Sequence, residues 1–135
     1  MDLQAQLEVL SPKLPPAIAL DVTDAGQWPR QGFDAVFSAN TCHIMSAAAV
    51  PHLLAGASRV LRPSGLLLLY GPFHDGGVHT AASNAAFDQH LRSLDPAMGV
   101  RDASELVQQA QNLGLERLAD LPLPANNRML VLERR

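Results

Sequence analysis

The chain has 135 residues, of which 47% are hydrophobic and 17% charged, and its formal net charge is −3. This length and composition predict one folded, soluble domain of ordinary size over residues 1–135, without a basic surface for nucleic acid. The single cysteine, Cys42, excludes an internal disulfide and a cysteine-rich metal site. The longest apolar run, residues 66–70, is too short to span a bilayer, so we expect a cytoplasmic protein that binds neither nucleic acid nor membrane.

The spacing of hydrophobic residues in the first half of the chain predicts helices and strands. In chain order it predicts a helix over residues 2–10, strands over residues 17–22 and 33–39, and a helix over residues 46–61. Ser46 is a candidate N-cap of the last of these helices, and Pro51 suits its first turn.

The second half predicts a third strand followed by two helices and two closing strands. In chain order these are a strand over residues 65–70, a glycine-rich loop over residues 71–80, helices over residues 83–94 and 103–113, and strands over residues 115–121 and 129–133. Residues 65–70 are apolar on both faces, which is typical of a central parallel strand. The pattern indicates an α/β fold with about five strands in a mainly parallel sheet. The last strand should be antiparallel, because a short loop cannot make a parallel crossover.

Polar residues gather where the predicted strands end, at Asp21, at Ser38 and Asn40, and after Tyr70. In open parallel sheets, ligands bind beyond the carboxyl ends of the strands. These positions therefore predict a ligand crevice.

Several linked segments carry a family resemblance. They are "FDAVFSANTCHIM", "VLRPSGLLLLYGPF", "SNAAFDQHLRSLDP", "GVRD" and "PANNRMLVLERR". From about residue 17 onward the chain resembles the methyltransferase-like family called domain of unknown function 938, which is of the class I S-adenosylmethionine-dependent type. The resemblance implies a partial Rossmann-like fold, whose parent has the strand order 3-2-1-4-5-7-6, and methyl transfer to an unidentified small acceptor.

The resemblance also implies that part of the cofactor site is missing. None of the nine glycines forms a Gly-x-Gly loop, and the chain begins after the position of the first two parent strands. Close backbone approach to the cofactor needs glycine, and ribose recognition needs an acidic residue. We therefore expect this chain, as a truncated methyltransferase-like domain, to bind S-adenosylmethionine weakly or not at all.

By the same resemblance, four residues would contact the cofactor: Asp21, Asn40, Thr41 and His43. His43 would also be the catalytic general base, since its reference pKa lies near ~6.5. Two alternatives stay open from the residues alone. Asp21 also suits an Asx turn before Thr23, and His43 also suits a histidine that bonds a loop carbonyl. Cys42 is predicted to be a packed side chain rather than a nucleophile.

Eight further residues are candidates for the acceptor pocket: Tyr70, Pro72, Phe73, Asn84, Asp88, Arg101, Asn126 and Asn127. For Asn126 and Asn127, ordinary turn chemistry is the alternative. Phe87 and Leu91, one helical turn apart, are predicted to be core. His74 and His79 lack the spacing of a helical metal motif, so no metal site is predicted.

The sequence leaves two functions open. One is a methyltransferase, and the other is a non-catalytic remnant that acts as an interaction or dimerisation module, with a homodimer compatible with either. We expect residues 18–20, 35–37 and 66–69 to belong to the core. We also expect residues 18–22 to pair in parallel beside residues 35–38, because an unpaired buried strand would leave backbone groups unsatisfied at roughly 1–3 kcal/mol each.

Overall fold

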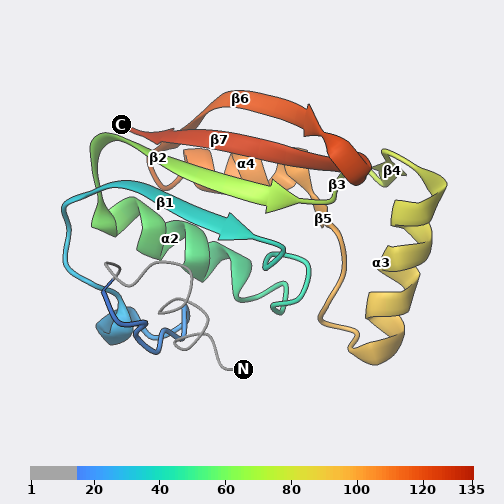
Figure 1. Ribbon diagram of the computed structural model, residues 1–135, viewed down its shortest axis with the longest axis horizontal. Coiled ribbons are helices and arrows are strands. Elements are labelled where there is room, and N and C mark those ends of the chain that lie inside the picture. Colours follow the sequence, from blue (N-terminus) through green and yellow to red (C-terminus); the bar gives the residue numbers. More distant parts are fainter. Residues whose placement is uncertain (1–14) are drawn as a thin grey trace.

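The computed structural model describes residues 15–135, and the helix predicted over residues 2–10 lies outside them. Figure 1 shows its elements along the chain. In order they are η1 (Ala25–Gln27), β1 (Phe33–Ala39), α2 (Val50–Val60), β2 (Leu61–Gly71), β3 (Phe73–Asp75), β4 (Val78–His79), α3 (Ala82–Leu94), β5 (Arg101–Asp102), α4 (Ala103–Gln111), β6 (Leu115–Leu123), η2 (Pro124–Asn126) and β7 (Asn127–Arg134).

The main sheet has the strand order β1-β2-β7-β6. Strand β1 runs parallel to β2, whereas β7 runs antiparallel to both β2 and β6. This order matches the 4-5-7-6 portion of the strand order implied by the resemblance. The mixed sheet confirms the α/β fold class, and the antiparallel pairing of the last two strands is confirmed.

The core lies between the sheet and two helices. Alternate residues of β2 and β7, among them Leu67, Leu69, Leu130 and Leu132, belong to one buried cluster with side chains of α2 and α4. Helix α3 stands apart from this cluster, at the end of the sheet where β2 ends (Figure 1). The carboxyl end of β2 is therefore surrounded by loops and by α3 rather than by the core helices.

A small second sheet, in the order β4-β3-β5, lies within and beyond the predicted glycine-rich loop. Strands β3 and β4 form a hairpin in which His74 pairs with His79. The turn of this hairpin is Gly76-Gly77, with φ of 58° and 88°. Two consecutive positive φ angles suit a tight hairpin turn, and glycine adopts them without strain.

The predicted strand over residues 17–22 is wrong. The described structure has no strand there, nothing pairs beside the outer edge of β1, and Ile18 is 66% exposed. Local polar contacts replace strand pairing. The Asp21 carboxylate accepts hydrogen bonds from the backbone and the hydroxyl of Thr23, and the Trp28 indole N–H donates to the Val22 carbonyl at 3.0 Å. Backbone groups of this segment can therefore meet partners or solvent without a neighbouring strand.

The core prediction is confirmed only in part. Leu67 and Leu69 of β2 are fully buried, as expected. Residues 18–20 are exposed, and Phe37 of β1 is 61% exposed although Val36 beside it packs against the core. Successive strand residues point to opposite faces, so Phe37 lies on the face of β1 that turns away from α2 and α4.

The contact between Trp28 and Gly56 of α2 yields a prediction. A Cβ at Gly56 would lie 2.0 Å from Cε2 of Trp28, so alanine cannot fit unless the indole moves. We expect Gly56→Ala to lower the free energy of unfolding by about 1–3 kcal/mol, although alanine is ordinarily the better helix former. Urea unfolding followed by far-ultraviolet circular dichroism measures this change, and the same readout serves variants that lack the single tryptophan.

The control is the same substitution in a Trp28→Ala background, where the obstructing ring is gone. There Gly56→Ala should cost much less, because the two residues are coupled through direct contact. Equal costs in the two backgrounds would contradict the packing described.

Candidate functional site

The sequence predicts a ligand crevice at the carboxyl edge of the sheet, where β1 and β2 end side by side. The Asn40 backbone N–H donates to the Tyr70 carbonyl at 2.8 Å, and Asn40 adopts a left-handed conformation with φ of 55°. A hydrogen bond joins the hydroxyls of Ser38 and Thr41. A Cβ at Gly71 would lie 3.6 Å from Asn40 Oδ1 and 3.7 Å from His43 Nδ1. The end of β2 thus lies against the loop that carries Asn40, Thr41 and His43.

His43 is the most buried polar side chain of this loop, with only 4% of its surface exposed. Its ring meets the ring of Phe87 of α3 edge-on, with centroids 5.4 Å apart. Burial lowers the pKa of His43 below its ordinary value, and the Arg101 cation lowers it further. The imidazole is therefore neutral near pH 7, the state in which it can accept a proton.

Cys42, the neighbour of His43, is packed in the core cluster. Burial raises the pKa of the Cys42 thiol to about 11. The thiol is therefore protonated at neutral pH and is a poor nucleophile.

Arg101, predicted to line an acceptor pocket, donates hydrogen bonds to backbone carbonyls. Its Nε donates to the Cys42 carbonyl at 2.9 Å, and one terminal nitrogen donates to the carbonyls of Met45 and Ala97, each at 2.8 Å. These bonds tie the His43 loop to the segment that follows α3.

A second group of predicted residues gathers around the turn η2. The Asn127 amide donates to the Tyr70 hydroxyl at 3.0 Å, and the buried Asn84 amide of α3 donates to the Asn126 carbonyl at 3.0 Å. Asn126 and Ala125 both have positive φ, as ordinary turn chemistry suggests. Tyr70, Asn84, Asn126 and Asn127 are thus brought together, and they join α3 to the end of the sheet.

The remaining predicted residues have structural contacts. Phe73 is 1% exposed in the core cluster, and Pro72 is buried beside it. One Asp88 oxygen accepts from the Val100 backbone at 2.9 Å and from Arg92 at 3.1 Å. The exposed Asp21 carboxylate takes part in its Asx turn, and the hydrogen bonds from Thr23 lower its pKa.

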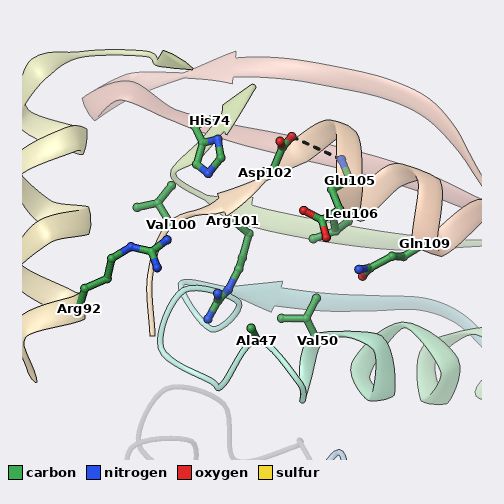
Figure 2. A pocket seen from close by; sticks show the side chains of 10 residues that line it. All are labelled: Ala47, Val50, His74, Arg92, Val100, Arg101, Asp102, Glu105, Leu106 and Gln109. Carbon is green, nitrogen blue, oxygen red and sulfur yellow. Dashed lines mark hydrogen bonds between the residues drawn. The ribbon is translucent and has the colours of Figure 1, made fainter. Parts of the chain in front are cut away.

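The structure also contains cavities that sequence reasoning missed. One, of about 190 Å³, lies between the starts of α2 and α4 and is lined by ten residues, including Arg92, Arg101 and Glu105 (Figure 2). Another, of about 410 Å³, is lined by Asn126, Asn127 and Arg128, among others.

Arg128 bridges Asp75 of β3 and Asp120 of β6, and its hydrogen bonds to Asp120 raise its pKa. Phe87, predicted to be core, contacts His43 while remaining partly exposed. No sequence motif marks these contacts, since their partners are 8 to 53 residues apart.

Neither metal-binding nor membrane-spanning features are found in residues 15–135. No three His, Cys, Asp or Glu side chains gather there in a way that could hold a metal ion. No helix in the same range has the length and apolar character needed to cross a bilayer.

Comparison with known families decides where the chain belongs. The model of the family described as "Protein of unknown function (DUF938)" matches residues 3–134. The chain belongs to this family.

Solved methyltransferase structures share the fold of this DUF938 chain. An O-methyltransferase family protein from Burkholderia thailandensis is 17% identical with a TM-score of 0.75, and the match covers 87% of this chain and 35% of that protein. The mitomycin 7-O-methyltransferase MmcR is 23% identical with a TM-score of 0.71, covering 83% and 32%. CalO1, a methyltransferase in calicheamicin biosynthesis solved in its SAH-bound form, is 16% identical with a TM-score of 0.70, covering 87% and 34%. The chain spans about a third of the length of these proteins, and the likeness shows a shared methyltransferase-type fold.

The lowered pKa of His43 makes folding stability depend on pH. In the unfolded chain the imidazole has its ordinary pKa of ~6.5, so the unfolded state binds a proton more readily than the folded state. The contribution of neutral His43 is therefore fully present above about pH 6.5 and is lost as the pH falls toward the folded-state pKa.

We expect His43→Gln to weaken this pH dependence, because glutamine does not titrate. Urea unfolding of both proteins in matched buffers between about pH 7.5 and pH 5 tests the expectation. An identical loss of stability in the variant over this range would contradict the pKa shift assigned to His43.

Proposed function

We propose that this chain supplies the acceptor side of a methyl-transfer site, with His43 as the general base. Placement of His43 is the observation that carries the proposal: a neutral, buried imidazole stands where β1 ends, beside the end of β2. Because solved structures with the same fold are O-methyltransferases, we infer that the acceptor group is a hydroxyl. An acceptor hydroxyl must lose its proton as its oxygen is methylated, and a positioned neutral histidine can take that proton.

The residues present fit only part of S-adenosylmethionine. The exposed Asn40 and Thr41 remain candidates to face the cofactor, and we retain Asp21 as a candidate for the adenine. No Gly-x-Gly loop occurs in the sequence, and the Asp21 carboxylate already accepts two hydrogen bonds from Thr23. The cofactor would supply the electrophilic methyl group, whereas the chain's own contribution is to position the acceptor and remove its proton.

Weak cofactor binding is the first expected result. Each lost charge-assisted hydrogen bond costs roughly 1.5–3 kcal/mol, and micromolar binding amounts to only about 8 kcal/mol. Losing the ribose carboxylate and one loop contact would therefore move the dissociation constant to about millimolar or weaker. Calorimetric titration of the purified chain with S-adenosylmethionine measures this, and Asp21→Ala should change little. Micromolar affinity that Asp21→Ala abolishes would contradict the partial site.

A transfer assay then tests the role of His43. The chain is incubated with methyl-labelled S-adenosylmethionine at millimolar concentration and a panel of phenolic acceptors. Because cofactor binding is expected to be weak, turnover by the wild-type chain should be low. Turnover by His43→Gln should be lower than that of the wild type by a factor of roughly 10²–10⁴. Turnover that is equal in the two proteins, or absent from both at saturating cofactor, would count against the catalytic proposal for this chain.

The alternative function, a dimerisation module, is favoured by the outer edge of β1. Within residues 15–135 no strand pairs with this edge, and Phe37 is 61% exposed. An open edge presents unpaired backbone groups that a second copy can pair with. Antiparallel self-pairing centred on Val36 would place Asp34 opposite Ser38, so that no like charges face each other.

Under this alternative, sedimentation should show a dimer that Phe37→Asp disrupts. Ile18→Asp, also at an exposed apolar residue but outside the sheet, is the matched control and should leave the dimer intact. A wild-type chain that stays monomeric at up to about 1 mM would contradict the dimerisation module. A dissociation constant above that concentration corresponds to a binding free energy of less than ~4 kcal/mol.

A further inference from the structure

Arg101 joins two segments that are far apart in the sequence. It donates to the carbonyls of Cys42 and Met45 in the loop after β1, and to the carbonyl of Ala97 after α3. We call Arg101 and these three carbonyls the Arg101 clamp. A planar guanidinium has five donors in a fixed fork, which allows one side chain to hold several acceptors at once.

The clamp encloses the backbone of His43. Between the carbonyls of Cys42 and Met45, the His43 carbonyl accepts a hydrogen bond from the Gly99 N–H at 3.0 Å. The Ala47 N–H donates to the Ala97 carbonyl at 3.0 Å, which adds a second direct bond between the same two segments. The His43 loop is therefore fixed on both sides of the histidine.

The orientation of Arg101 agrees with this role. Figure 2 shows its side chain extending toward the loop that ends at Ala47, away from His74 and Asp102. Its Nε and one terminal nitrogen are already engaged by carbonyls. Arg101 is thus less suited to bind an acceptor than to hold the loop.

Charge gives the clamp a second effect on His43. The Arg101 cation disfavours a positive charge on the imidazole. The other charged or titratable groups around the clamp are the Cys42 thiol, Asp88 and Arg92 of α3, and Glu105 of α4, all of which act on Arg101. Phe87, which packs on the imidazole from α3, carries no charge.

We propose that Arg101 is a positioning residue for His43. Its fork holds the loop so that the imidazole meets Phe87 at the end of β2, and its charge adds to the larger effect of burial in disfavouring a protonated imidazole. The catalytic meaning of this assignment rests on the proposed function of His43, whereas the positioning itself does not.

The experiment is an NMR titration of the His43 imidazole in the intact chain, without cofactor. Arg101→Gln should raise the pKa of His43 toward its ordinary value and remove the ring-current shift from Phe87, because both the charge and the fork are lost. Arg101→Lys retains the charge but not the fork. It should therefore leave the pKa lower than in Arg101→Gln while still losing the ring-current shift.

Arg92→Gln is the matched control. It removes a neighbouring cation that bonds Asp88 rather than the His43 loop, and it should change neither signal. Folded Arg101→Gln with both signals as in the wild type would overturn the proposal. If Arg101→Gln does not fold, Arg101→Lys decides: an unchanged ring-current shift overturns the positioning role, and its loss in a folded protein supports it.

The transfer assay separates this inference from the proposed function. If His43 is the base, Arg101→Gln should reduce turnover more at about pH 6 than at about pH 8, because a raised pKa leaves less neutral imidazole at the lower pH. A titration that supports the clamp, together with turnover that does not depend on His43, would defeat the proposed function and leave the positioning of His43 intact.

Discussion

The parallel pairing of β1 with β2 is the constraint on which the rest of the site depends. The register runs from Ala35 opposite Leu66 to Ala39 opposite Tyr70, so the two strands end at the same level. Because β2 also pairs with β7 on its other side, its apolar residues are held at the centre of the sheet. The loop after β1 must then leave the sheet beside Gly71, which is how Asn40 and His43 come to the carboxyl edge.

Two arginines bind several partners at this edge of the sheet. Arg101 holds backbone carbonyls around His43, and Arg128 joins β7 to carboxylates on β3 and β6. Arg128 has charged partners, and its pKa is raised chiefly by Asp120, whereas burial lowers the pKa of Arg101. Arg101 donates its hydrogen bonds to backbone carbonyls, while Asp88, Glu105 and Arg92 act on it only through their charges, and its own positive charge disfavours protonation of His43.

The sequence predicts the elements whose structure is set locally or by one short connection. Residues 33–39 form β1 as expected, and the short turn η2 imposes the antiparallel pairing of β6 with β7. Residues 17–22 have an equally apolar pattern, but a strand also needs a neighbour, and no pattern within the segment reveals whether one exists. For the site, the position of His43 follows from strand ends. The contacts of Arg101 and Asp88 depend on tertiary packing that spacing does not encode.

The distribution of exposure at the carboxyl edge suits the role that we propose for His43. Phe73, Asn84 and the ring of His43 are buried, whereas Asn40 and Thr41 are exposed on the same edge. A base must be shielded enough to remain neutral, yet its proton donor must reach it. Here α3 provides the shielding through Phe87, which is itself partly exposed. Small movements of α3 would therefore change both the access to His43 and its protonation. The hydrogen bond that the Asn84 side-chain amide donates to the Asn126 carbonyl opposes such movements by joining α3 to the end of the sheet.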